Sequence, residues 1–226
     1  EYAEGLDYIR SLTQKPIGFN ALIEKSSRKY HQRMANWIDI SLDKGIRFFI
    51  TSLGKPDWVV KRVHQYGGLV FHDITERKWA QIGVDCGVDG LICVNNRAGG
   101  HAGGLSAEEL YQQCAEFDKP LVCAGGIARA EELQAMLELG YQACQLGTRF
   151  LVSDECQIAL PYKQAIINAS EQDIVLTDRL TGVPVSIIRP EHKAEQELNA
   201  SGLLARMLKS SRFKHLARLF LTIKTA

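Results

Sequence analysis

Six short apolar runs, each followed by a segment with helical spacing, constrain the fold of this chain more than any other feature. They recur at intervals of 21 to 31 residues, which leaves room for one strand–helix unit each. Such regular alternation predicts a parallel β-sheet with helices outside it. The runs lie at residues 15–21, 46–51, 69–74, 90–95, 120–126 and 143–149.

Two parallel architectures are compatible with this alternation, the doubly wound sheet and the eight-fold barrel. The last two runs both end in glycine, in Ala124-Gly125-Gly126 and Leu146-Gly147-Thr148. Barrels commonly bind phosphate through the loops after strands seven and eight, where backbone N–H groups face the anion. A dinucleotide-binding sheet would carry G-x-G-x-x-G after its first strand, and the sequence has none there. We therefore predict an α/β fold of the TIM (β/α)8 barrel type.

Counting back from the two glycine-ended strands makes the first run strand three. Strands one and two are then missing, and six units cannot close with the geometry of an eight-stranded barrel. We expect the chain, which begins with Glu1, to lack roughly the first quarter of a barrel protein. The predicted domains are residues 1–150, with barrel units three to eight, and residues 151–226, a C-terminal helical extension ending in a basic amphipathic helix over 203–220.

The composition is that of an ordinary globular protein, with 46% hydrophobic and 23% charged residues among 226. A formal net charge of +1 argues against a nucleic-acid-binding protein, which would concentrate positive charge. The sequence has no secretory signal and no apolar run of membrane-spanning length, so we expect a cytoplasmic protein without a membrane partner. The six cysteines form no C-x-x-C pair and the histidines no ligand pattern, so no metal site is expected.

A glycine-rich loop over residues 94–104 carries a single histidine, His101. The loop follows an apolar run and precedes Ser106-Ala107-Glu108-Glu109, which is typical of a helix start. His101 is therefore expected where a parallel strand ends, which is where α/β proteins bind ligands. The alternative interpretation is a surface loop whose histidine is merely solvated.

Three motifs together carry a resemblance to a known family. They are Arg97-Ala98-Gly99-Gly100-His101-Ala102-Gly103, Ala124-Gly125-Gly126-Ile127 and Gln145-Leu146-Gly147-Thr148-Arg149-Phe150. With them the chain resembles the nitronate monooxygenases, over residues 6–189. This family belongs to a wider FMN-dependent group that includes the flavin-type enoyl-ACP reductases of fatty-acid synthesis.

The resemblance implies a catalytic residue and a set of FMN-binding residues. His101 would be the catalytic base beside the flavin ring, with Asn20 reaching the cofactor from the opposite side. The other implied contacts are Ala98, Gly99 and Gly100 along the flavin, and Gly125, Gly126, Gly147 and Thr148 on the FMN phosphate. Two departures stand out. This chain has His72-Asp73 where family members often carry a lysine near the flavin, and it lacks the family's N-terminal P-M-G segment.

The implied activity is FMN-dependent oxidation of alkyl nitronates, and of nitroalkanes as further substrates, with molecular oxygen as the oxidant. One alternative is an enoyl-thioester reductase that uses NAD(P)H. A second is an incomplete or degenerate barrel without turnover. The partners expected are therefore a small-molecule substrate and O2, and the sequence leaves the oligomeric state open, a homodimer included.

Overall fold

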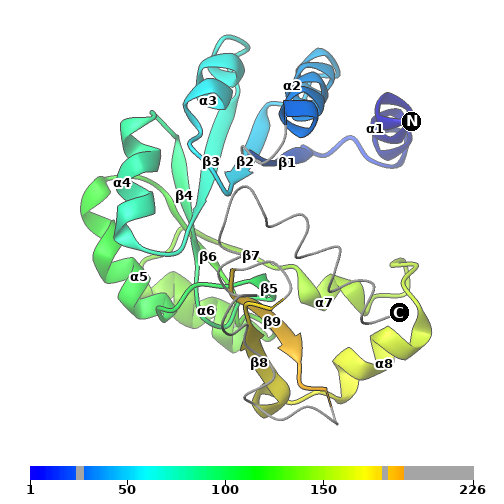
Figure 1. Cartoon of the computed structure of the whole chain (residues 1–226), viewed down its shortest axis with the longest axis vertical. Helices are drawn as coiled ribbons and strands as arrows, with labels where there is room; N and C mark the ends of the chain where they lie inside the picture. The colour runs from blue at the N-terminus through cyan, green and yellow to red at the C-terminus, as the bar shows by residue number, and fades with distance from the viewer. Residues whose placement is uncertain (24–27, 180–182, 191–226) are drawn as a thin grey trace. The chain divides into compact units, whose positions relative to one another are not determined.

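The structure is a computed structural model that describes residues 1–23, 28–179 and 183–190 (Figure 1). It divides into two compact units. The first comprises residues 1–93, 108–123 and 137–143. The second comprises, among the described residues, 94–107, 124–136, 144–179 and 183–190.

A six-stranded sheet forms the centre of the fold, in the order β1-β2-β3-β4-β6-β7. The first four strands pair in parallel with their sequence neighbours, so the predicted parallel α/β sheet is confirmed. Each strand coincides with one of the six apolar runs. The strands are β1 (Gly18–Leu22), β2 (Phe48–Ser52), β3 (Leu69–Ile74), β4 (Gly90–Val94), β6 (Leu121–Ala124) and β7 (Ala143–Gln145).

Helices precede or follow these strands where the helical spacing predicted them. Proline precedes the first residue of α3, and Gly45, with φ of +82°, follows the helix before it in a left-handed turn that glycine adopts freely. The helices are α1 (Tyr2–Leu12), α2 (Arg28–Asp43), α3 (Asp57–His64), α4 (Arg77–Asp85), α5 (Ala107–Cys114) and α6 (Ala130–Leu139).

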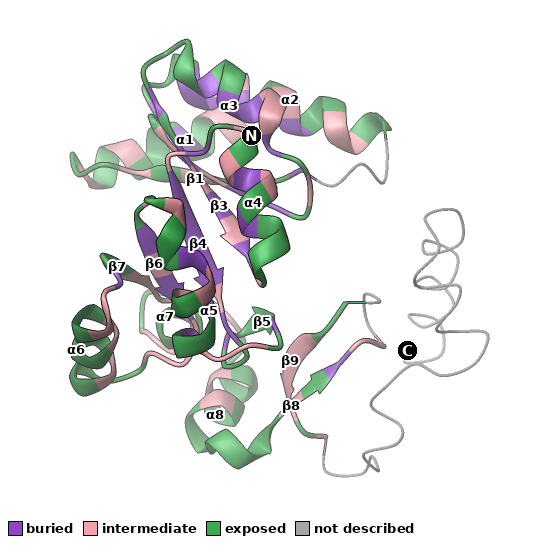
Figure 2. Cartoon of the chain, turned by 90° about the vertical axis from the view of Figure 1, so that its left-hand side faces the viewer, coloured by how far each residue is buried: buried purple, intermediate pink, exposed green. Residues whose placement is uncertain are grey.

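One face of the sheet packs against helices and carries the core of the first unit. A Cβ atom at Gly83 of α4 would lie 3.3 Å from His72 and 3.4 Å from Leu91, so these two side chains face the helix layer. Side chains alternate along a strand, so Phe71 and Asp73 lie on the opposite face of β3. Figure 2 shows the buried residues concentrated along the central strands.

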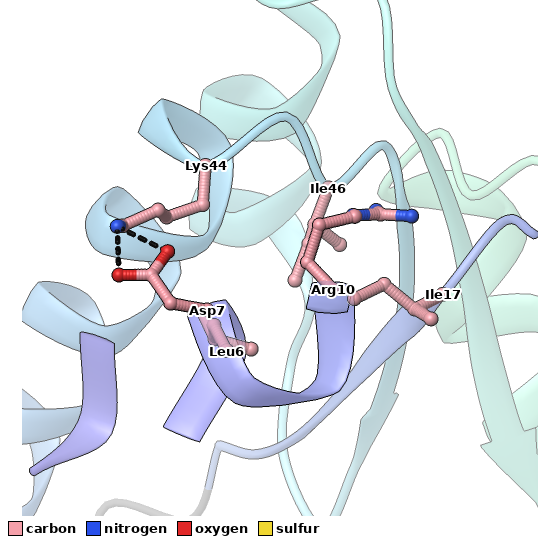
Figure 3. A pocket seen from close by; sticks show the side chains of 6 residues that line it. All are labelled: Leu6, Asp7, Arg10, Ile17, Lys44 and Ile46. Carbon is pink, nitrogen blue, oxygen red and sulfur yellow. Dashed lines mark hydrogen bonds and ion pairs between the residues drawn. The ribbon is translucent and has the colours of Figure 1, made fainter. Parts of the chain in front are cut away.

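An ion pair links α1 to the residue that follows α2. Nζ of Lys44 donates to both carboxylate oxygens of Asp7 at 2.5 and 2.6 Å. Beside this pair is a small cavity of about 30 Å³, lined by Leu6, Asp7, Arg10, Ile17, Lys44 and Ile46 (Figure 3). A cavity of this volume holds about one water molecule, so it is not a site for a flavin or an organic substrate.

The second unit contains a three-stranded antiparallel sheet that the sequence interpretation missed, in the order β5-β9-β8. Its strands are β5 (Gly100–His101), β8 (Ile174–Thr177) and β9 (Val185–Ile188). The unit also contains α7 (Thr148–Leu151) and α8 (Leu160–Asn168).

The C-terminal part of the chain is described only to residue 190. Within it, α8 is followed along the chain by strands β8 and β9. The predicted amphipathic helix over 203–220 lies outside the described residues. The division into residues 1–150 and 151–226 stays a prediction.

Candidate active site

His101 lies on a short strand rather than in a free loop. It pairs with Val185 of β9, and its neighbour Gly100 pairs with Ser186. Two further bonds hold the same segment: Oγ of Ser186 donates to the carbonyl of Ala98 at 2.6 Å, and the N–H of Ala102 donates to the carbonyl of Pro184 at 3.3 Å. The residue is exposed, so an ordered backbone presents its imidazole at the surface of the second unit.

Sequence reasoning missed the strand that orders this histidine. The available signal was the β-branched and apolar run Val185-Ser186-Ile187-Ile188 directly after Pro184. Such a run predicts a strand, but nothing in it identifies the distant Gly100–His101 pair as its partner.

Two loops, one at Gly125-Gly126 and one at Gly147-Thr148, pack directly against the loop over residues 94–104 that carries His101, here called the histidine loop. A Cβ atom at Gly99 would overlap Oγ1 of Thr148, and one at Gly125 would overlap the side chain of Asn95 and lie 2.6 Å from the N of Ala98. The predicted residues Ala98, Gly99, Gly125 and Thr148 are therefore brought together. An added Cβ atom would collide with the Thr148 side chain at Gly99 and with Asn95 and the Ala98 backbone at Gly125, which explains why both positions are glycine.

The remaining predicted glycines differ in how much room surrounds them. A Cβ atom at Gly126, where φ is +72°, would lie 2.9 Å from Cβ of Arg97. At Gly100, where φ is +77°, and at Gly147, a Cβ atom would meet no atom within 4 Å. The Gly147 position is thus open beside Thr148, which is where a bound group would need space.

Charged side chains surround the Gly126 loop. Nε of Arg97 lies 2.8 Å from Oε1 of Glu171, and its Nη2 lies 3.7 Å from Oε1 of Glu132. Oε2 of Glu132 accepts the N–H groups of Ala128 and Arg129 at 2.7 and 3.0 Å. The bond from Ala128 is the main cause of the lowered pKa of Glu132. Because Glu132 occupies the amides that lead into α6, an anion at this loop would have to use Gly125 and Gly126 instead.

These motifs and the fold agree with one protein family along nearly the whole chain. The family model of nitronate monooxygenase matches residues 1–218. The chain belongs to this family. The recognition made from its three motifs is therefore confirmed.

Proteins similar to this chain include both a monooxygenase and a carboxyl-CoA dehydrogenase. A probable nitronate monooxygenase of Staphylococcus saprophyticus is 31% identical over 180 residues, which cover 73% of this chain and 51% of that protein. A (3aS,4S,5R,7aS)-5-hydroxy-7a-methyl-1-oxo-octahydro-1H-indene-4-carboxyl-CoA dehydrogenase of Mycobacterium tuberculosis is 24% identical, covering 97% of this chain and 62% of that protein. The chain spans between about half and three fifths of the length of these relatives.

Two solved structures share the fold of this chain. FabK from Thermotoga maritima aligns with a TM-score of 0.79 and 23% identity, covering 97% of this chain and 66% of that one. Nitroalkane oxidase from Streptomyces ansochromogenes aligns with a TM-score of 0.71 and 26% identity, covering 82% and 66%. The likeness confirms the barrel prediction, with the barrel partial in this chain.

The second unit fits the phosphate group of a flavin cofactor by its packing and its donors. Gly126 provides a backbone N–H in a left-handed turn, and the N–H of Thr148, as the first residue of a helix, has no partner within that helix. The hydroxyl of Thr148 adds a third donor. Backbone and hydroxyl donors at strand ends are the groups that bind phosphate in barrels of this kind.

The remaining predicted cofactor residue, Asn20, belongs to the first unit. It lies on β1, exposed, in register with Ile50 of β2. It therefore belongs to a different unit from the other predicted cofactor residues, and its contact with the cofactor stays a prediction.

The two residues that depart from the family pattern, His72 and Asp73, have different surroundings. His72 is buried, its Nδ1 lies 2.8 Å from Oγ1 of Thr51, and burial lowers its pKa to about 4. It is therefore a neutral core residue that faces the helix layer. Oδ1 of Asp73 is buried without a hydrogen-bond partner, and burial raises the pKa of this carboxyl to about 7.

The described part of the chain has neither a cluster of metal-ligating side chains nor a membrane-spanning helix. Within residues 1–23, 28–179 and 183–190, no three His, Cys, Asp or Glu side chains gather as metal ligands. Over the same residues, no helix is long and apolar enough to cross a membrane.

Proposed function

We propose that this protein is a flavin-dependent oxidoreductase that binds FMN and oxidises alkyl nitronates with molecular oxygen. The observation that carries the proposal is the packing of the His101 loop against the two glycine loops, in a member of the nitronate monooxygenase family. The likeness to a nitroalkane oxidase structure at 26% identity supports the same substrate class.

The proposal gives each predicted residue a role. Ala98, Gly99 and Gly100 line the flavin, and Asn20 makes a further contact with it. Backbone N–H groups and a hydroxyl hold the dianionic phosphate. They belong to Gly125, Gly126, Gly147 and Thr148.

His101 is the proposed base. When bound, FMN would supply the electron-transfer and oxygen chemistry that no side chain of the protein can supply. A neutral imidazole can accept the α-proton of a neutral nitroalkane, while an imidazolium attracts the anionic nitronate, and histidine exchanges between these forms near neutral pH. The pairing of His101 with β9 fixes the backbone from which the imidazole acts.

An absorbance titration tests the proposal directly. The purified chain is mixed with FMN, and an alkyl nitronate is then added without oxygen. Binding should perturb the flavin bands, and the nitronate should bleach them. A bound flavin whose bands stay those of the oxidised form after addition of the nitronate would contradict nitronate oxidation. Bands identical to those of free FMN would contradict flavin binding.

Replacing His101 tests its role as the base. His101→Asn should retain FMN and lose the use of neutral nitroalkanes about a hundredfold, since general-base catalysis typically contributes that much or more. The use of preformed nitronates should fall much less. His64→Asn, at an exposed histidine of α3 paired with Asp89, is the matched control. An equal loss with both substrates, or no loss, would contradict the role of base.

A second candidate function is an enoyl-thioester reductase that uses NAD(P)H. It is favoured by the relative that acts on a CoA thioester and by the fold shared with FabK. Oxidation of NAD(P)H that requires an enoyl-thioester would establish it. A third alternative, an incomplete or degenerate barrel without turnover, predicts that the protein stays colourless after incubation with FMN and removal of free flavin.

A further inference from the structure

Asn95 lies at the start of the histidine loop, and its buried side chain contacts the Gly125 loop. No sequence motif identified this residue. Only 2% of its surface is exposed. Its Nδ2 donates to the carbonyl of Gly125 at 3.0 Å, and its Oδ1 accepts the N–H of Arg97 at 2.8 Å. One amide group thus bonds the glycine loop on one side and the start of the histidine loop on the other.

The backbone of Asn95 holds both flanks of the same histidine. Its carbonyl accepts the N–H of Ala98 at 3.2 Å and that of Gly103 at 3.3 Å. These two residues lie on either side of His101. Its own N–H donates to the carbonyl of Ala124 at 3.0 Å, which adds a second bond to the strand that leads into the glycine loop.

The Gly125 loop and the histidine loop are in direct contact, with no space for an additional atom at Gly125. A Cβ atom at Gly125 would overlap Oδ1 of Asn95 and come within 2.6 Å of the N of Ala98. A shift of Gly125 therefore moves Asn95 or breaks its bond, because packed interiors do not deform continuously.

We propose that Asn95 is a positioning residue that makes the order of the His101 loop depend on the phosphate group of the bound flavin. The inference rests on the proposed function, in which Gly125 and Gly126 hold that phosphate. A dianion bound there fixes Gly125, the fixed Gly125 carbonyl orients the Asn95 amide, and that amide holds the backbone that leads to His101. Linkage is reciprocal, so the ordered histidine loop also favours FMN over riboflavin, which lacks the phosphate.

Hydrogen exchange with two flavins tests the inference on the full chain. FMN should slow the exchange of the Ala98 and Gly103 amides about tenfold more than riboflavin does, which corresponds to a modest coupling between sites. Both flavins are used at concentrations that saturate binding, so the two samples differ only in the phosphate.

Asn95→Asp removes the donor to Gly125 and keeps an acceptor for Arg97. It should abolish the difference between the two flavins at Ala98 and Gly103. Asn96→Asp, the same substitution at the exposed neighbouring residue, should leave the difference unchanged. Asn95→Ser replaces Asn95→Asp if the aspartate variant does not fold.

Three results would overturn the coupling through Asn95. They are equal protection by FMN and riboflavin in the wild type, an Asn95 variant that keeps the wild-type difference, and an Asn96→Asp variant that loses it. If the wild type binds neither flavin, the proposed function fails as well. Binding of FMN without the difference in protection refutes the coupling alone.

Discussion

Replacing Asp73 with asparagine should stabilise the protein, and the gain should grow as the pH rises. Oδ1 of Asp73 is buried without a hydrogen-bond partner, so nothing offsets the loss of hydration at this oxygen when the carboxyl ionises. Burial raises the pKa of this group from 3.8 to about 7. A folded-state pKa above the unfolded value means that the folded state binds the proton more tightly. Stability is therefore lost as the pH rises from about 4 to about 7.

The size of the effect follows from the two pKa values. Each factor of ten in proton affinity corresponds to about 1.4 kcal/mol, so the separation between 3.8 and about 7 corresponds to about 4 kcal/mol. Nearly all of this cost is present from pH 7 upward, and only about 0.5 kcal/mol of it at pH 4. Asparagine has a similar shape and no charge, so Asp73→Asn removes the pH-dependent part of the cost.

Urea unfolding at a series of pH values between 4 and 8.5 measures the prediction. The free energy of unfolding of Asp73→Asn should exceed that of the wild type by about 3 to 4 kcal/mol more at pH 8 than at pH 4. Asp43→Asn, at an exposed carboxylate at the end of α2, serves as the control and should follow the wild type. Parallel curves for Asp73→Asn and the wild type would refute the assignment of an uncompensated buried carboxyl.

Two further substitutions test the second unit. Gly99→Ala should weaken FMN binding at least tenfold in a flavin-fluorescence titration, because the added Cβ would overlap Oγ1 of Thr148. The control Gly104→Ala, where a Cβ meets no atom within 4 Å, should bind FMN normally. Equal affinities of the two variants would contradict the packing. Ser186→Ala should lower the free energy of unfolding in urea by about 1 kcal/mol, because the hydrogen bond to the Ala98 carbonyl is lost. Ser186→Thr keeps a hydroxyl and should restore part of this stability. An unchanged stability in Ser186→Ala would count against that bond.

The parallel sheet could be predicted because its information is local. Runs such as Leu69–Ile74 and Gly90–Val94 are apolar over the length of one strand, and helix-start and glycine signals separate them. The family motifs likewise identified Ala98, Gly99, Gly125 and Thr148, which the structure brings together. These residues are close in space because each follows the carboxyl end of a strand in a parallel sheet.

The features that sequence reasoning missed depend on partners that are distant in the chain. The two-residue strand Gly100–His101 is too short to show any alternation, and it exists only because β9 pairs with it. Asn95 resembles any polar loop residue until Gly125 and Arg97 are placed around it. Which of His72 and Asp73 faces the helices depends on α4, which packs against one face of β3.

The pairing of His101 with Val185 also sets an order of events during synthesis. The ribosome adds about 5–20 residues per second, so the partner strand emerges several seconds after the histidine itself. The six strands of the parallel sheet have all been made by then, since the last of them ends at Gln145. A nascent chain thus completes the strands of its scaffold first, and His101 gains its strand partner only when synthesis has passed β9.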